Sequence, residues 1–247
     1  MKDLIKRIEK TGDAALALRA LRTVYLRDFY AFAKYLLGYK DMQIHAHDEI
    51  VQVLESGANR KLVVVPRGTF KSSLCSVAYP IWRLLKDPNL TILIDSELYT
   101  NSKNFLREIK GHLVSERLTS IFGQLAGEKW DESEIILKTR TKNIKEASIT
   151  IGGLGTTKVG QHYGCIIADD LNSPENSSTP EKCQKVIDHV RYNLNILNPG
   201  GEYLFIGTRY AERDILGFLL KEILDEHYLA EGKLQRGKPE ALTEKEF

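Results

Sequence analysis

One segment of the sequence has the residue types and spacing to bind a chain of phosphates. An apolar run at 63–65 leads into the turn PRGTFKSS at 66–73. In such a turn, backbone N–H groups at the start of a helix bind anionic oxygens, a lysine adds positive charge, and a serine hydroxyl can ligate Mg²⁺. Lys71 and Ser72 are the candidates for the last two roles, so the segment predicts a loop that binds a nucleotide triphosphate. The expected loop residues are Pro66, Arg67, Gly68, Thr69, Phe70, Lys71, Ser72 and Ser73.

The match of this segment to the phosphate-loop pattern GxxxxGK[ST] is imperfect. Val65 and Phe70 stand where the glycines of the pattern would be. Taken alone, the segment can also be an ordinary strand-to-helix turn with a surface lysine. Because a bulky side chain tolerates positive φ poorly, we expect Phe70 to have ordinary backbone angles and Gly68 to take any strained position.

A pair of adjacent acids ends another apolar run, CIIADD at 165–170. Mg²⁺ prefers oxygen ligands and keeps several waters, so one carboxylate beside the phosphate loop can hold it, and Asp169 is the candidate. The next side chain along a strand points the other way and can orient or deprotonate an attacking water, which makes Asp170 the candidate base. A helix cap or a turn is the alternative for paired acids. The two motifs together favour a nucleotide site.

The elements around these motifs alternate between apolar runs and amphipathic stretches. Strands are expected at 62–65, 91–95, 163–170 and 201–210, helices at 14–37, 45–54, 71–85 and 97–113, and a hairpin at 130–151. A glycine-rich turn precedes the acidic strand, and a helix-like tail comes after residue 214. Strands that alternate with helices are typical of an α/β sandwich with a largely parallel sheet.

Composition excludes several other classes of protein. The 247 residues are 43% hydrophobic and 28% charged, as in a globular protein. No apolar run approaches the roughly 20 residues that span a bilayer, so we expect no membrane association. The three cysteines have no CxxC spacing, which favours a reducing compartment and argues against a zinc site. The net charge of +2 does not indicate which kind of molecule the protein binds.

With these motifs, the chain resembles the ATPase domain of tailed-bacteriophage large terminase subunits, the motors that pump viral DNA into procapsids. The resemblance runs from about Gln43 to Asp214. It rests on PRGTFKSS, IIADD, QIHAHDEIVQVL, ILIDSELYTNSKNFLREIKGHL, GLGTTKVGQHYG and FIGTRY. The phosphate loop of that family often lacks the usual glycines and carries a Pro-Arg pair, as this one does.

The resemblance implies a fold and a domain organisation. The fold is a P-loop NTPase of the RecA/ASCE-like type, a three-layer sandwich with N-terminal helices and a small C-terminal lid. We expect an N-terminal helical segment at 1–42, an ATPase core at 43–210, and a lid or linker at 211–247 toward an absent nuclease domain. Because the chain ends soon after the coupling motif, we expect no nuclease activity. The last ten or so residues are expected to be disordered.

The resemblance also implies residue roles around the nucleotide. Lys71 and Ser72 would contact phosphate and Mg²⁺, Asp169 would be the metal-associated acid, and Arg67 would sense phosphate within the loop. Asp170 stands where the catalytic base is more usually Glu, and its shorter side chain leaves the base about one methylene further from the water.

Further roles fall on residues outside the phosphate loop and the acidic strand. The coupling motif, which links loss of the γ-phosphate to subdomain movement, corresponds to Gly207, Thr208 and Arg209. Gln43 and His47 would contact the adenine, although a solvated helix face is nearly as well supported. Family members supply an arginine to a neighbouring subunit, and the aligned residue here is a lysine. The candidates for this trans-acting residue are Lys158, Arg140, Arg191 and Arg213.

The expected function comes from the resemblance. It is Mg²⁺-dependent ATP hydrolysis that powers translocation of viral double-stranded DNA into procapsids, with ATP and Mg²⁺ as cofactors. The expected partners are DNA, the portal protein, the small terminase subunit and further copies of the chain in a ring, and the expected location is the host cytoplasm. The isolated chain is expected to be a monomer and a poor hydrolase. The alternatives are a nucleotide-binding scaffold with little turnover and another DNA-dependent, helicase-like P-loop ATPase.

Overall fold

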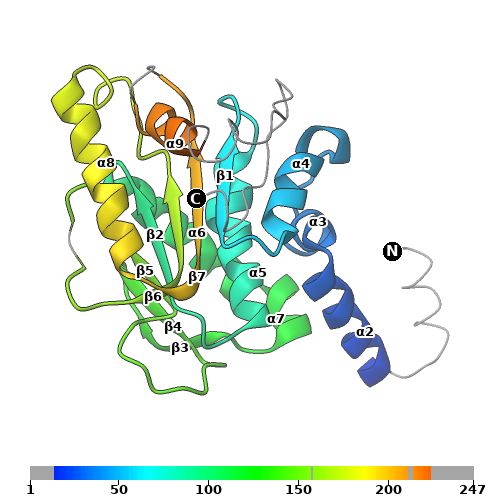
Figure 1. The fold of residues 1–247 in the computed structure, drawn as a ribbon. Helices are drawn as coiled ribbons and strands as arrows, with labels where there is room; N and C mark the ends of the chain where they lie inside the picture. Colours follow the sequence, from blue (N-terminus) through cyan, green and yellow to red (C-terminus); the bar gives the residue numbers. More distant parts are fainter. Residues whose placement is uncertain (1–13, 157, 211–213, 224–247) are drawn as a thin grey trace.

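A mixed sheet forms the centre of the molecule (Figure 1). The computed structural model describes residues 14–156, 158–210 and 214–223, and within them the sheet has seven strands in the order β1-β7-β6-β2-β5-β4-β3. The strands are β1 (Arg60–Val64), β2 (Ile92–Ser96), β3 (Ala126–Trp130), β4 (Glu134–Leu137), β5 (Ile149–Ile151), β6 (Tyr163–Asp169) and β7 (Leu197–Gly207). From β1 to β5 in this order, each strand is parallel to its neighbour. Strand β4 is antiparallel to both of its neighbours, β5 and β3. The parallel strands therefore end at one edge, where ligands bind in open α/β sheets.

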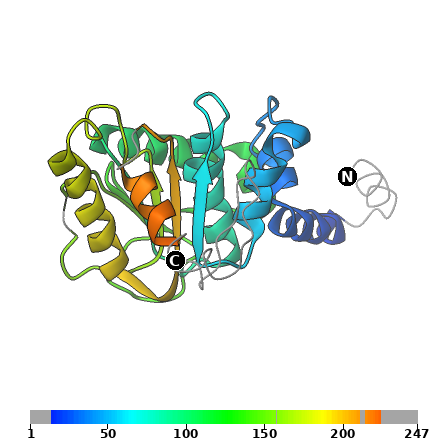
Figure 2. The ribbon, with the colours of Figure 1, turned by 45° about the horizontal axis from the view of Figure 1, so that its top comes forward.

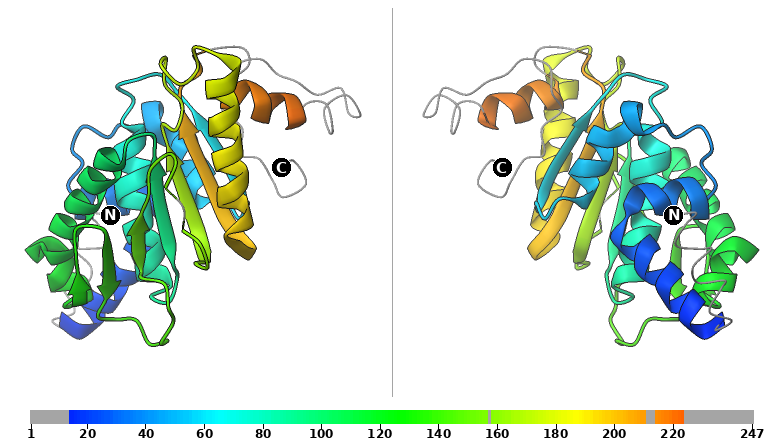
Figure 3. Two further views of the ribbon diagram at one scale, coloured as in Figure 1. Left: turned by 90° about the vertical axis from the view of Figure 1, so that its left-hand side faces the viewer. Right: turned by 90° about the vertical axis from the view of Figure 1, so that its right-hand side faces the viewer.

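Helices cover both faces of this sheet, as the two side views in Figure 3 show. The helices are α2 (Ala14–Arg27), α3 (Phe29–Ala31), the π-helix η1 (Phe32–Leu36), α4 (Ile44–Glu55), the π-helix η2 (Ser73–Ala78), α5 (Tyr79–Lys86), α6 (Tyr99–Val114), α7 (Glu116–Phe122), α8 (Pro180–Asn195) and α9 (Ile215–Ile223). The helices from α2 to α7 pack on one face, whereas α8 and α9 pack on the other. The α2–α4 end of the molecule lies far from α8 (Figure 2).

The pleat of the strands divides their side chains between two cores. Cys165 and Ile167 of β6 face the helices of the first core, whereas Ile166 and Ala168 face α8 and α9. Because both faces are covered, most side chains of the central strands are apolar, as is typical of parallel sheets. The predicted three-layer sandwich with a largely parallel sheet is confirmed.

The N-terminal helices α2 and α3 are separated at Asp28. Asp28 has extended backbone angles between α2 and α3, and its side chain accepts a hydrogen bond from the backbone N–H of Ala31 at 2.7 Å. This is the geometry of a helix N-cap, so the predicted helical stretch becomes separate helices at this acid. The indole N–H of Trp82 donates to the carbonyl of Tyr25 at 2.9 Å and ties α2 to α5.

A buried ion cluster fixes the elements on either side of the phosphate loop. Lys61 of β1 is 1% exposed and Glu202 of β7 is 6% exposed, with 3.3 Å between Nζ and Oε1. The Lys61 ammonium also donates to the hydroxyl of Tyr79 at 2.8 Å, and Arg83 pairs with Glu202. Tyr79 and Arg83 belong to α5, so the cluster joins β1, β7 and the helix that comes after the loop.

Several elements differ from the sequence prediction. Helices α7 and α8 and strand β3 were not predicted. The hairpin expected at 130–151 is the antiparallel pair of β4 and β5, but β5 also pairs in parallel with β2, and β3 adds a further antiparallel pair with β4. Strand β7 ends at Gly207 rather than at residue 210. No helix in the described part of the chain is long and apolar enough to cross a membrane.

The predicted domain boundaries at residues 42 and 210 stay predictions. The first side chains of α9, Ile215, Leu216 and Leu219, are buried in the same core as α8. Arg213, the expected disordered C-terminus and most of the expected lid lie outside the described residues.

Candidate functional site

The phosphate loop leaves β1 at the edge where the parallel strands end. Gly68 has a φ of 81°, as expected, but Phe70 has a φ of 65°. The expectation that Phe70 has ordinary backbone angles is therefore wrong. It considered only the local steric cost, whereas the Phe70 ring packs edge-on against Tyr39, with 5.2 Å between ring centroids, and against His47 at 6.1 Å. Long-range packing, which the local sequence does not reveal, accompanies the left-handed backbone.

A helix begins directly after the loop. The backbone N–H of Leu74 donates to the carbonyl of Phe70 at 3.1 Å, and Ser72 has helical angles, with φ −68° and ψ −38°. The next turn, η2, is a π-helix, a feature that is frequent at functional sites. Lys71 and Ser72 therefore lie in the first turn, where helix N–H groups are free to bind an anion.

Lys71 joins the three sequence motifs. Its side chain is largely buried, and its ammonium lies 2.8 Å from Oδ1 of Asp170 and 2.9 Å from the hydroxyl of Thr208. The phosphate loop, the acidic strand end and the coupling motif thus meet around one ammonium group. The sequence predicted that the first two converge, and the contact with Thr208 adds the third.

Asp170 reaches this position through a turn and not through the pleat of a strand. Strand β6 ends at Asp169, and Asp170 has a φ of 46°. Its backbone N–H donates to the carbonyl of Ile206 on β7 at 2.8 Å. The expectation that the pleat turns the two acids apart is corrected in this respect. Asp tolerates the left-handed region better than most residues, which gives a physical reason for Asp rather than Glu here.

Asp169 offers an unpaired oxygen at the end of β6. Its Oδ2 accepts a hydrogen bond from the hydroxyl of Ser76 at 2.5 Å, while Oδ1 is buried without a partner. Burial raises the pKa of Asp169 to about 6, an effect opposed by the hydroxyls of Ser76 and Ser72. A buried carboxylate with a free oxygen, next to a serine hydroxyl, is a donor set that suits Mg²⁺. The residues present therefore fit a magnesium ion.

Arg67 and Tyr210 connect the phosphate loop to the segment after β7. The Nε of Arg67 donates to the hydroxyl of Tyr210 at 3.1 Å, and the guanidinium lies 5.5 Å from the centre of the Tyr210 ring. No role was predicted for Tyr210, which ends the FIGTRY motif. Both predicted cations of the loop, Lys71 and Arg67, thus contact the segment that carries Thr208.

Asp214 organises that segment, and no role was predicted for it either. It is fully buried and accepts hydrogen bonds from the Asn172 amide at 2.7 Å and from the backbone N–H groups of Tyr210 and Gly217 at 2.8 Å each. The Asn172 amide lies after the acidic strand and also approaches the carbonyl of Thr208 at 3.4 Å. An acid directly before an apolar helix was the signal that could have revealed it.

The other predicted residues occupy different places. Gly207 is buried at the end of β7 and Arg209 is exposed. His47 is mostly buried on α4 and its Nδ1 lies 2.8 Å from the carbonyl of Gln43, which is exposed. This pair is near the phosphate loop, because the Phe70 ring contacts His47.

The candidates for a trans-acting residue differ in how they are held. Lys158 lies on the loop between β5 and β6, where its backbone N–H donates to the hydroxyl of Tyr192 on α8 at 2.7 Å. Arg140 is half-buried and donates to the carbonyl of Glu146, and burial lowers its pKa. Arg191 is exposed on α8. Its guanidinium lies 3.7 Å from Asp188, and which of these residues acts in trans stays a prediction.

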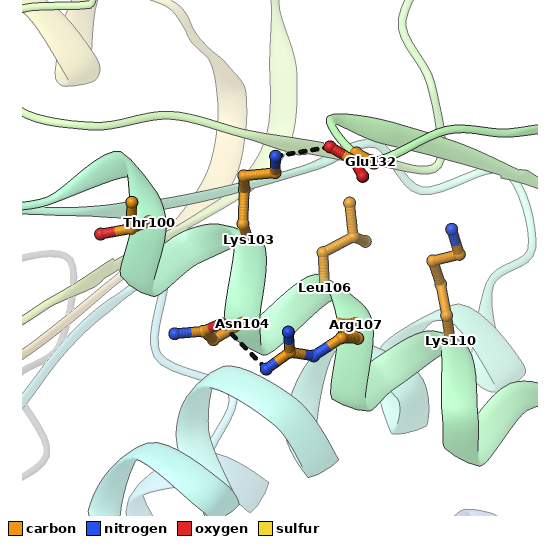
Figure 4. A pocket seen from close by; sticks show the side chains of 7 residues that line it. All are labelled: Thr100, Lys103, Asn104, Leu106, Arg107, Lys110 and Glu132. Atoms are coloured by element: carbon orange, nitrogen blue, oxygen red, sulfur yellow. Dashed lines mark hydrogen bonds and ion pairs between the residues drawn. The ribbon is translucent and has the colours of Figure 1, made fainter.

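A separate cavity of about 410 Å³ opens along α6 (Figure 4). Its charged lining is already engaged: Lys103 pairs with Glu132, and the ammonium of Lys110 donates to the carbonyls of Trp130 and Asp131 at 3.0 and 3.2 Å. None of its lining residues belongs to the motifs that meet at Lys71.

Comparisons with known proteins find similarity to large terminase subunits. No family model matches the chain. The large terminase subunit of Enterobacteria phage T3 is 28% identical over 216 residues, covering 80% of this chain, which spans about a third (34%) of that relative's length. The Thermus phage P74-26 large terminase ATPase domain matches in structure with a TM-score of 0.50 and 16% identity, covering 83% of this chain and 77% of that chain. The chain thus shares the α/β fold of that ATPase domain, and its resemblance to large terminase subunits is confirmed.

Proposed function

We propose that the chain is the ATPase of a DNA-packaging motor and hydrolyses ATP with Mg²⁺. The observation that carries this proposal is the position of the Lys71 ammonium, 2.8 Å from Asp170 and 2.9 Å from Thr208. The similarity to the phage T3 large terminase subunit supports the packaging role. Magnesium, when bound, would neutralise charge on the phosphates and template the attack.

The contacts of the site residues suggest a role for each of them in nucleotide binding and hydrolysis. Asp169 and Ser72 would hold the metal, and backbone N–H groups at the start of the helix would bind the phosphates. Lys71 would then exchange its bonds to Asp170 and Thr208 for phosphate oxygens. Asp170 would be freed to orient or deprotonate the attacking water.

The exchange of Lys71 contacts on nucleotide binding would also couple the nucleotide to movement of the segment after β7. Thr208 belongs to the proposed coupling motif, and Arg67 contacts Tyr210 two residues later. Release of both contacts would free the segment that Asp214 ties to α9. Gly207, Thr208 and Arg209 would transmit this change, while Gln43 and His47 would lie on the adenine side.

The proposed partners are those of a packaging motor. Duplex DNA would be the cargo, and the portal protein, the small terminase subunit and further copies of the chain in a ring would assemble with it in the host cytoplasm. Lys158 or Arg191 would act on the nucleotide of a neighbouring copy. A site completed in this way works only when subunits meet, so the isolated chain would hydrolyse slowly.

Phosphate release measured over a range of protein concentrations tests the proposal. We expect the rate per chain to rise with concentration and to fall by about 10²- to 10⁴-fold in Asp170→Asn, the range typical of loss of a catalytic base. Asp131→Asn, an exposed acid on the β3–β4 turn, is the matched control and should hydrolyse at the wild-type rate. Equal background rates in wild type and Asp170→Asn would refute the ATPase and favour a nucleotide-binding scaffold.

A further inference from the structure

Phe70 is held in a backbone conformation that its side chain disfavours. Within the described residues, positive φ outside glycine occurs only at Phe70, which directly precedes Lys71, and at Asp170, which contacts the Lys71 ammonium. For a residue with a Cβ, this region is disfavoured by a factor of roughly 5 to 30. Such strain persists where the surrounding structure holds it, and it gathers at functional sites.

Two aromatic side chains that pack against the Phe70 ring keep the residue in this conformation. Tyr39, after η1, meets the ring edge-on with an interplanar angle of 90°, and His47, on α4, meets it at 71°. Tyr39 is itself anchored on α6, where its hydroxyl donates to Glu108 at 3.3 Å. The ring is therefore clamped by elements that lie outside the phosphate loop and precede it in the chain.

The backbone angle at Phe70 sets the direction of the helix that begins after it. The carbonyl of Phe70 accepts the first hydrogen bond of this helix, from Leu74, and Lys71 is the next residue. A change of φ at Phe70 would move the start of the helix and the Lys71 side chain together.

We propose that Phe70 is a positioning residue. The packing of its ring against Tyr39 and His47 holds the phosphate loop in the conformation that presents Lys71 to the phosphates. The N-terminal helical segment thereby contributes to nucleotide affinity without touching the phosphates. This inference rests on the proposed function, because it names a determinant of the same site.

Two substitutions at one position separate conformation from packing. Phe70→Gly and Phe70→Ala both remove the ring, but only glycine adopts positive φ without steric cost. We expect calorimetric titration with Mg²⁺ and a non-hydrolysable ATP analogue to give at least about fivefold tighter binding for Phe70→Gly than for Phe70→Ala. If the side chain only filled space, glycine would bind no more tightly than alanine, because it adds flexibility to the loop.

A double-mutant cycle tests the clamp itself. Tyr39→Ala should weaken binding several-fold when Phe70 is present and by less than about twofold in the Phe70→Gly background, where there is no ring to hold. Circular dichroism and urea midpoints establish that each variant is folded. If Tyr39→Ala does not fold, Tyr39→Leu replaces it in the cycle.

The outcomes distinguish the two proposals. Tighter binding by Phe70→Gly than by Phe70→Ala, with loss of the Tyr39 effect, supports the inference. Equal affinities of the two Phe70 variants, or an equal Tyr39 effect in both backgrounds, would overturn the inference and leave the proposed function intact. Absence of nucleotide binding by the wild-type chain would overturn the proposed function and the inference with it.

Discussion

Replacement of Glu202 by glutamine should test the ion cluster that frames the phosphate loop. The change keeps the size of the side chain but turns one acceptor oxygen into an NH₂ donor, and it removes the only acid among the cluster residues Lys61, Tyr79, Arg83 and Glu202. Burial already lowers the pKa of Lys61, and Glu202 opposes this effect. Glu202→Gln would therefore leave the buried Lys61 ammonium facing the Arg83 guanidinium without a counter-charge.

The expected cost of Glu202→Gln is large relative to the whole stability of a domain. Removing one partner of a buried ion pair typically lowers the free energy of unfolding by about 3–5 kcal/mol. Because the Arg83 side chain is 24% exposed, we expect the lower end of this range, about 3 kcal/mol. Native domains are stable by roughly 5–15 kcal/mol. For a chain of this size, the urea midpoint should fall by about 1 M with an unchanged slope.

Urea unfolding followed by circular dichroism measures this cost. Adding Lys61→Met to Glu202→Gln removes the unpaired ammonium and should recover part of the loss. The loss should also shrink at high pH: the folded-state pKa of Lys61 lies below its unfolded value, so the penalty is full below the folded pKa and fades as the pH rises from there to the unfolded pKa.

A matched control separates burial from charge. Glu132 pairs with Lys103 at the surface, where the side chains are 81% and 40% exposed, and Glu132→Gln should leave the midpoint unchanged. A loss below about 1 kcal/mol for Glu202→Gln, or no recovery on adding Lys61→Met, would refute the reasoning, because a buried unpaired cation must cost more than that.

Two further predictions concern the site itself. Lys71→Met removes the charged contacts expected with the phosphates. It should weaken the binding of Mg²⁺ with an ATP analogue, measured by calorimetry, by about 10- to 100-fold, because a charge-assisted hydrogen bond contributes roughly 1.5–3 kcal/mol. Unchanged affinity in a folded variant would show that Lys71 does not bind the nucleotide. Asp214→Ala leaves the Asn172 amide and the N–H groups of Tyr210 and Gly217 without their acceptor, and should lower the free energy of unfolding by about 2 kcal/mol or more. Urea titration measures this, with Asp188→Ala on the exposed face of α8 as the control, and equal midpoints for the two variants would contradict the assigned role of Asp214.

The motifs were readable from the sequence because their chemistry is local. A β-branched run before PRGTFKSS and an apolar run before two acids each specify a strand that ends in polar groups, whichever other strands surround it. The alternation of strands and helices then predicts a parallel sheet, whose strands end at one edge. Convergence of Lys71 and Asp170 was predictable from these rules before any contact was known.

Elements without a strong local signal were missed. Helix α8 begins at Pro180 after the N-cap Thr179, but its polar face gives it a low mean hydropathy, and its role depends on the sheet that it covers. Strand β3 has no buried residue, so its sequence carries no clear alternation of apolar and polar side chains. Strand β5 was expected in a hairpin, but its parallel pairing with β2 is set by the rest of the sheet.

The sequence alone determined the α/β class, the phosphate loop and the acidic strand end, because side-chain type and spacing act over a few residues. The tertiary structure decided which groups meet: Thr208 with Lys71, Tyr210 with Arg67, and the Phe70 ring with Tyr39 and His47. These contacts join residues far apart in the chain, so their geometry depends on strand order and helix packing. The left-handed backbone at Phe70 shows this most clearly, because local sterics disfavour the conformation that long-range packing accompanies.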